Sequence, residues 1–321
     1  MNRKIKITLY VLLFLFVFVL SALLTANYFG SLPQRLMWVE WNDTIGTTYT
    51  DLDYTNEKGH QYDLYIPNSL NKDEMQYLIL FIHGGSFNSG KKEDGASFCE
   101  YYADKGYITA TLDYTLQTKG GGGASLHQMN AEIKNCVDSI SETCAELGYS
   151  LGGMATCGVS AGGTLAMNYA LMSATKSSVP VKFVFQLAAP ADFEPSDWNL
   201  LKKVDRIKTD AEFASMMTGF QITDEMMEAG EYSHYIDEIS PARLIRKDTV
   251  PFLMGYGLKD HCVPTYLKYR LLDALDDNEI TYEYIEFPNS NHGLYGDLDK
   301  LQEFLDKSLD YCNLYFHKSS E

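Results

Sequence analysis

Gly158-Val159-Ser160-Ala161-Gly162 decides the fold that this sequence predicts. The pentapeptide follows a short apolar run, residues 154–159, and opens a helical pattern that continues to residue 174. A serine on such a strand-to-helix turn is exposed at the end of its strand. Glycine is needed on both sides because a side chain at either position would clash in the strained turn. The pattern is weak alone, but this context indicates that Ser160 is a nucleophile.

A second motif, His83-Gly84-Gly85-Ser86-Phe87, directly follows the apolar run at residues 77–82. Two glycines let backbone N–H groups turn toward an oxygen on which negative charge develops, as acyl transfer requires. We expect Gly84 and Gly85 to supply two such donors and Ala161, beside the serine, to supply a third. An isolated H-G-G is usually an ordinary tight turn, but this one ends an early core strand.

A serine nucleophile needs a histidine base, and the base needs a carboxylate that orients it. His292 lies between the last predicted strand and the last predicted helix, and Asp260 follows the strand before it. Both lie on loops at the carboxyl ends of strands, as Ser160 does, and the order Ser160, Asp260, His292 is the one expected of this architecture. The remaining candidates for the base fit less well: His60, His127, His234, His261 and His317.

Short apolar runs alternate with helical patterns along most of the chain. The predicted strands cover residues 61–66, 77–82, 107–114, 154–159, 181–187, 251–256 and 281–287, and the predicted helices cover 94–104, 126–145, 161–174 and 297–316. Several runs are apolar on both sides, as expected for strands covered on both faces. This alternation predicts a mostly parallel α/β sheet. It breaks at residues 192–247, which we interpret as an insertion with two short helices, starting near Asp210 and after Thr223.

These motifs resemble the α/β-hydrolase fold and, more narrowly, the esterase/lipase group related to hormone-sensitive lipase and the acetyl esterases, including the acetylxylan/feruloyl esterase-like branch. The matching residues are HGGSF (83–87), Asp113-Tyr114, GVSAGG (158–163), residues 257–264 around Asp260, and NHG (291–293). The resemblance extends from about residue 50 to the C-terminus. Two residues depart from the pattern: Ser86 replaces a common third glycine, and Val159 replaces a polar residue before the nucleophile.

The resemblance implies two-step acyl transfer on a central sheet with a small helical cap. Ser160, Asp260 and His292 would be catalytic, and Gly84, Gly85 and Ala161 would form the oxyanion hole. No metal or organic cofactor is implied. The expected function is a carboxylesterase acting on small esters with short acyl chains, including acetyl groups on carbohydrate. Two alternatives remain open: a serine peptidase on the same fold, and a catalytically inactive binding protein.

The N-terminus predicts a membrane anchor. Residues 7–26 carry no charge, and about 20 such residues cross a bilayer core. Basic residues precede them and no acidic residue lies before Glu40, so residues 1–6 should stay in the cytosol and the rest should be exported. Cleavage after Ala26 would release a secreted enzyme, but the apolar run is long for a signal peptide and Leu24 fits the −3 position poorly. We expect an uncleaved anchor, a stalk over 27–45 and a catalytic domain over 46–321.

The charge balance limits the ligands. The chain carries 26 Lys+Arg against 43 Asp+Glu, a net charge of −17, so DNA, RNA and other polyanions are poor ligands. The insertion is rich in acidic residues and lacks the broad apolar face of a helix that meets a lipid surface. This favours short-chain esters over lipids. Neither composition nor motifs indicate an oligomeric state.

Overall fold

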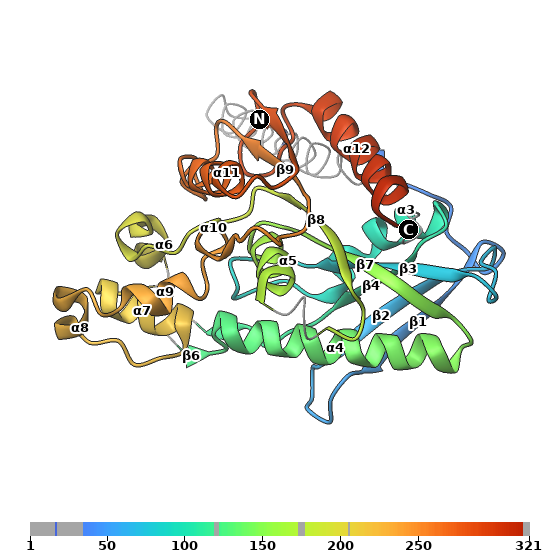
Figure 1. The fold of residues 1–321 in the computed structure, drawn as a ribbon, viewed down its shortest axis with the longest axis horizontal. Coiled ribbons are helices and arrows are strands. Elements are labelled where there is room, and N and C mark those ends of the chain that lie inside the picture. Colours follow the sequence, from blue (N-terminus) through green and yellow to red (C-terminus); the bar gives the residue numbers. More distant parts are fainter. Residues whose placement is uncertain (1–16, 18–34, 119–121, 173–176, 205, 317–321) are drawn as a thin grey trace, which may run out of the picture.

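A mixed β-sheet of eight strands forms the centre of the fold (Figure 1). The computed structural model describes residue 17 and residues 35–118, 122–172, 177–204 and 206–316. The strands are β1 (Gly46–Asp53), β2 (Gln61–Pro67), β3 (Met75–Ile82), β4 (Ile108–Leu112), β7 (Ser150–Val159), β8 (Val181–Leu187), β9 (Phe252–Gly257) and β10 (Tyr282–Phe287), in the order β1-β2-β4-β3-β7-β8-β9-β10. All neighbours from β4 to β10 are parallel, whereas β2 is antiparallel to β1 and β4. The predicted mostly parallel sheet is confirmed.

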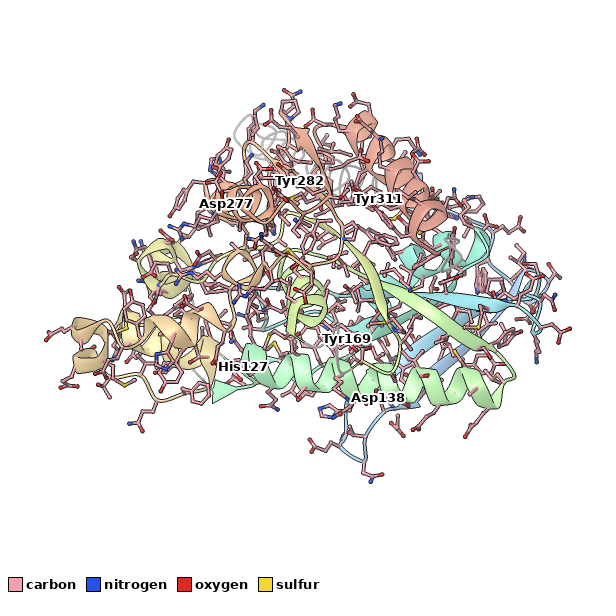
Figure 2. All side chains as sticks on the ribbon, in the orientation of Figure 1. His127, Asp138, Tyr169, Asp277, Tyr282 and Tyr311 are labelled. Atoms are coloured by element: carbon pink, nitrogen blue, oxygen red, sulfur yellow. The ribbon has the colours of Figure 1, made fainter. Side chains whose placement is uncertain are left out.

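Helices cover both faces of this sheet. One face packs against α3 (Ala96–Asp104), which continues the short 3₁₀ turn η1 (Lys92–Gly95), and against the C-terminal helix α12 (Leu298–Phe316). The other face packs against α4 (Leu126–Glu146), α5 (Ala161–Met172) and α11 (Leu267–Asp277). Figure 2 shows Tyr311 on α12 and Tyr169 on α5, and the Tyr311 hydroxyl donates to the carbonyl of Phe252 on β9, 3.1 Å away.

Each of the seven predicted strands overlaps one strand of the sheet, but several other elements, among them β1 and α11, were not predicted. Strand β1 is largely polar and lies at the edge of the sheet, where it pairs with β2 through an irregular register between Tyr49 and Leu52. Helix α11 buries Leu267, Leu271 and Leu275, a helical spacing in a short segment otherwise rich in charge. A small hairpin of β5 (Gln117–Thr118) and β6 (Gly122–Gly123) stands apart from the sheet.

The insertion between β8 and β9 consists of short helices that gather at one end of the molecule (Figure 1). They are the 3₁₀ turn η2 (Pro195–Asp197), α6 (Asn199–Val204), α7 (Asp210–Thr218), α8 (Asp224–Ala229), α9 (Ser233–Asp237) and α10 (Pro241–Leu244). The two predicted helices are confirmed as α7 and α8. Thr209 and Glu212 form a capping box on α7, and α8 ends at Gly230, whose φ of 73° suits glycine.

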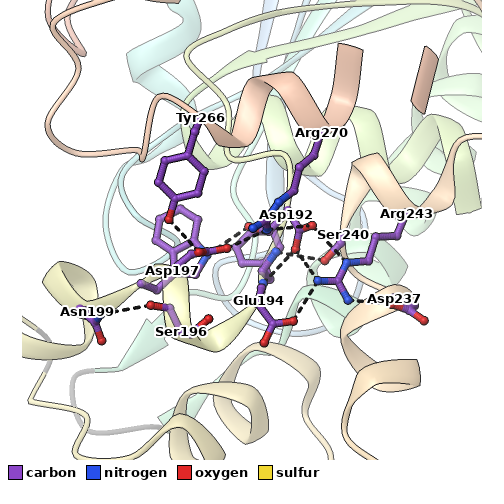
Figure 3. A network of polar contacts seen from close by, with 12 residues as sticks. Asp192, Glu194, Ser196, Asp197, Asn199, Asp237, Ser240, Arg243, Tyr266 and Arg270 are labelled. Atoms are coloured by element: carbon purple, nitrogen blue, oxygen red, sulfur yellow. Dashed lines mark hydrogen bonds and ion pairs between the residues drawn. The ribbon is translucent and has the colours of Figure 1, made fainter. Parts of the chain in front are cut away.

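A network of charged side chains connects the first residues of the insertion to α10, near its end, and to α11 outside it (Figure 3). The buried Asp192 carboxylate forms ion pairs with Arg243 Nη2 at 3.0 Å and with Arg270 Nη1 at 3.2 Å. Asp197 binds Arg270 Nη1 at 2.7 Å and accepts a hydrogen bond from the Tyr266 hydroxyl, also at 2.7 Å. The network therefore holds the first residues of the insertion against the helix that follows the Asp260 loop.

The predicted anchor at residues 7–26 lies outside the described residues, apart from Val17. Among the residues that the structure describes, no helix is long and apolar enough to cross a membrane. The described part of the predicted stalk, residues 35–45, lies against the body of the molecule. Trp41 Nε1 donates to Thr48 Oγ1 on β1 at 2.9 Å. The apolar residues of this segment that pack on the cluster containing α3 and α12 are Leu36, Met37, Val39 and Trp41.

Candidate active site

Ser160 occupies a sharp turn between β7 and α5. Its φ of 56° lies in the left-handed region, which is uncommon for a residue other than glycine. A Cβ on Gly162 would lie 2.0 Å from the carbonyl oxygen of Ile82, and a Cβ on Gly158 would lie 2.6 Å from the same atom. The expected need for both glycines is confirmed, because only a bare backbone fits this close to the end of β3.

The side chains of Ser160, His292 and Asp260 form a hydrogen-bonded chain. His292 Nε2 lies 2.9 Å from Ser160 Oγ, and His292 Nδ1 lies 2.7 Å from Asp260 Oδ2. The Asp260 side chain is buried, at 3% exposed, whereas the imidazole keeps about a quarter of its surface, 24%. The three residues come from the ends of β7, β9 and β10, so the parallel sheet brings them together.

Backbone contacts orient the Asp260 carboxylate. Its Oδ1 accepts from the N–H groups of Cys262 at 2.7 Å and Val263 at 3.0 Å, which leaves Oδ2 for His292. The loop also lies against the histidine loop, since a Cβ on Gly257 would be 2.6 Å from the carbonyl oxygens of both Ser290 and Asn291. The carboxylate is thus aimed before any substrate arrives.

Asp297 holds the loop that carries His292, a role that the sequence analysis did not predict. Its carboxylate accepts from the backbone N–H and the side-chain amide of Asn289 and from the hydroxyl of Ser290, at 2.7–2.9 Å. Burial opposes ionisation of Asp297, but the hydrogen bonds from Ser290 and Asn289 outweigh it, so its pKa lies below the ordinary value. The one sequence feature that could have indicated this role is an acidic residue directly before the last helix.

The His83 motif lies beside the nucleophile. A Cβ on Gly84 would be 3.4 Å from Ser160 Cβ and 2.7 Å from the carbonyl oxygen of Val159. Gly85 has a φ of 115° and Ser86 has a φ of 53°, so the chain turns sharply there. Ala161 begins α5 immediately after the serine. The structure therefore brings the backbones of Gly84 and Ala161 close to Ser160, and Gly85 lines the same cavity as the serine.

His83 and Tyr114 support this turn from beneath. The two rings stack with centroids 4.3 Å apart, and the Tyr114 hydroxyl donates to the carbonyl of His83 at 2.9 Å. His83 Nδ1 lies 2.8 Å from the carbonyl oxygen of Gly84. Burial lowers the pKa of His83, which keeps the ring neutral near pH 7. Asp113-Tyr114 matched a family pattern in the sequence, but the pattern did not reveal this support.

A cavity of about 470 Å³ opens at Ser160 and His292. Gly84, Gly85 and Ser86 line it on one side. Its volume falls within the range of roughly 300–1,000 Å³ that is typical of sites for small organic ligands. The reactive groups therefore face a preformed space.

The donor atoms of Asp260, Cys262 and His292 lie within 4.8 Å of one another, a spacing that a metal ion could bridge. Asp260 and His292 already use those atoms for their mutual hydrogen bond. A metal ion there would have to replace that bond. The arrangement therefore fits the orientation of His292 toward Ser160 better than it fits metal binding.

Esterases of known structure share this fold. A truncated carbohydrate esterase from gut microbiota superposes with a TM-score of 0.66 at 16% identity, over 85% of this chain and 99% of that one. Esterase B from Lactobacillus rhamnosis gives 0.61 at 19% identity, over 92% and 96%. The esterase Est2 of Thermogutta terrifontis gives 0.64 at 19% identity, over 86% and 95%.

Three curated proteins match the chain by sequence, each at 23% identity. The kynurenine formamidase of Danio rerio is 23% identical over 154 residues, covering 47% of this chain and 49% of the relative. A probable isoprenylcysteine alpha-carbonyl methylesterase of Oryza sativa subsp. japonica is 23% identical over 262 residues, covering 78% and 60%. The chain spans about half the length of the curated relatives it matches.

Fold and site together define an α/β hydrolase of the serine esterase class. The predicted resemblance to that class is confirmed. Within the class, the chain belongs to the BD-FAE family, whose model matches residues 62–275.

The Asp297 carboxylate provides a test of how the histidine loop is held. We expect Asp297→Asn to lower the free energy of unfolding by about 2 kcal/mol at neutral pH, because the charged acceptor of three hydrogen bonds is lost. A group with a depressed folded-state pKa stabilises above its unfolded pKa and stops doing so as pH falls through the folded value. The difference in Tm between wild type and variant should therefore shrink as the pH falls below about 4.

The matched control is Asp299→Asn, two residues further along and exposed. Its effect on Tm should stay small at every pH. Equal effects of the two variants, or a Tm difference for Asp297→Asn that does not change with pH, would contradict the role assigned to Asp297.

Proposed function

We propose that this chain is a serine carboxylesterase that hydrolyses small esters with short acyl chains, including acetyl groups on carbohydrate. The observation that carries the proposal is the chain of hydrogen bonds from Ser160 through His292 to Asp260 at the mouth of the cavity. Membership of the BD-FAE family and the carbohydrate esterase among the structural neighbours support it. No metal or organic cofactor enters the proposed reaction.

The first step is attack of Ser160 Oγ on the ester carbonyl carbon. His292 Nδ1 donates to Asp260, so Nε2 carries the lone pair that takes the serine proton. The carbonyl oxygen becomes an oxyanion, and we assign its stabilisation to the N–H groups of Gly84, Gly85 and Ala161. When the intermediate collapses, the bond to the alcohol oxygen breaks and His292 returns the proton to the departing alcohol.

The second step releases the acid. Water attacks the acyl-enzyme carbonyl, His292 Nε2 takes the proton from that water, and Ser160 Oγ leaves and recovers its proton. Asp260 holds the imidazole in one orientation throughout, which its contacts with the N–H groups of Cys262 and Val263 favour. The same two reaction steps would cleave a formamide, the substrate type that the name of the formamidase relative implies.

The packing of the insertion supports a short acyl chain. Met216 and Met217 on α7 are buried, and Met226 and Met227 on α8 pack against the core, so these apolar clusters face the body. A helix that binds a lipid surface would instead present such a face outward. The strongly acidic chain also repels anionic bilayers.

The nucleophile and the acid give the first functional test. Ser160→Ala should lower kcat for p-nitrophenyl acetate by at least about a thousandfold and abolish labelling by a fluorophosphonate probe. Asp260→Asn should lower kcat by about 10³–10⁴-fold with little change in KM, since it disturbs the tautomer and orientation of the imidazole. Ser196→Ala, at an exposed serine of the insertion, is the control. Full turnover by Ser160→Ala would rule out the assignment, and absence of probe labelling in the wild type would indicate an inactive binding protein.

The acyl preference can be measured with p-nitrophenyl esters from acetate to palmitate at matched solubility. We expect kcat/KM to be highest for acetate or butyrate, because the methionine clusters of the insertion pack against the body and do not form an outward face for lipid. A maximum at about ten carbons or more, with activation at an oil–water interface, would instead indicate a lipase. Aminoacyl anilides should be poor substrates if the chain is an esterase rather than a peptidase.

We also propose that residues 7–26 anchor the chain in a membrane with the catalytic domain outside the cytosol. The support is the uncharged run and the basic residues before it. The full-length protein should remain in membranes after alkaline carbonate extraction and keep its N-terminus in intact-mass analysis. A mature chain that begins near Asn27 and stays in the soluble fraction would point to secretion.

A further inference from the structure

The cavity at Ser160 extends into the apolar layer between the sheet and the helices α3 and α12. The aromatic and aliphatic residues that line this part are Phe81, Phe98, Phe185, Leu187, Leu294 and Phe304. Phe185 and Phe304 are 1% and 2% exposed, so the cavity reaches well below the surface. An acetyl group at Ser160 would fill only a small part of about 470 Å³.

Two polar side chains that line the cavity, Gln186 and Asp94, already have hydrogen-bond partners. Gln186 donates from Nε2 to the Tyr256 hydroxyl at 2.9 Å and accepts from the N–H of Ala189 with Oε1, also at 2.9 Å. Asp94 accepts from the backbone N–H of Lys91 at 3.1 Å. Against the aromatic and aliphatic walls, the hydroxyls of a sugar would lose their hydrogen bonds to water without replacement, which is costly. The acyl chain of an ester is hydrocarbon, so it gives up no hydrogen bonds to water when it enters the cavity.

One wall of this cavity comes from outside the α/β fold. Met37 lies in the segment before β1, is half-buried against the cluster that contains α3 and α12, and lines the cavity. Its neighbour Trp38 is 73% exposed and is not among the lining residues. Adjacent residues therefore differ sharply: one contacts the cavity and the other faces solvent.

We propose that this apolar cavity binds the acyl chain and that Met37 is a specificity-determining residue that limits acyl length. The proposal rests on the esterase function proposed above. Shortening the side chain at position 37 should extend the cavity, and a ring at that position should shorten it. Since burying one CH₂ group is worth about a fourfold change in kcat/KM, room for two more should change selectivity by on the order of tenfold.

The test compares full-length wild type with Met37→Ala, Met37→Phe and the control Trp38→Ala. Each protein is assayed on p-nitrophenyl acetate, butyrate, hexanoate and octanoate, and the ratio of kcat/KM for each ester to that for acetate is reported. The ratio cancels any difference in the amount of folded enzyme. We expect Met37→Ala to raise the hexanoate-to-acetate ratio by about tenfold, Met37→Phe to lower the butyrate-to-acetate ratio severalfold, and Trp38→Ala to match the wild type.

A second series holds the acyl group as acetate and varies the alcohol. In this series the relative kcat/KM values for the different alcohols should be the same in all four proteins. If these values change between proteins while the acyl ratios do not, the assignment of the cavity to the acyl chain is wrong. Met37 variants that are labelled by a fluorophosphonate but keep the wild-type acyl profile would overturn the role of Met37 alone. A wild type that hydrolyses no ester and takes no label would overturn the proposed function and this inference with it.

Discussion

The close approach of the β7–α5 turn to the end of β3 is the constraint on which the site depends. The backbone of Gly162 lies so near the carbonyl of Ile82 that no side chain fits between them, and Gly84, just beyond that strand, fits against Val159 in the same way. Because these backbones are in contact, the oxyanion loop and the nucleophile are positioned by the same two neighbouring strands. Ser160 can adopt its left-handed conformation because the surrounding strands hold the turn on both sides.

Around this contact, the parallel order of β7, β8, β9 and β10 places the other loops. Asp260 and His292 each follow a strand, so their loops emerge at the same edge of the sheet as Ser160. Fixing them further requires polar contacts: backbone N–H groups on Asp260 and the Asp297 carboxylate behind His292. The charged network from Asp192 to Arg270 does the same for the insertion, and gives a short-helix segment a defined attachment to the core.

Local patterns were sufficient for the parts of the fold that repeat. The apolar runs predict the strands and the glycines around Ser160 predict the turn. A strand buried on both faces needs apolar residues, and a turn this tight needs glycine. Strand β1 was missed because its polar sequence becomes a strand only by pairing with β2. The role of Tyr114 beneath the His83 turn and the position of Met37 in the cavity wall depend on contacts between distant segments, and no short pattern encodes those.

The attachment of residues 35–45 to the body determines how far the enzyme can reach. If residues 7–26 span a membrane as proposed, only residues 27–34 separate the bilayer from chain that is already packed against the domain. Eight residues, even fully extended, cover about 28 Å, less than the width of a small domain. The cavity would then stay within a few nanometres of the lipid headgroups. Esters fixed to a surface or a polymer would be cleaved only within that distance, whereas small dissolved esters would reach the cavity by diffusion.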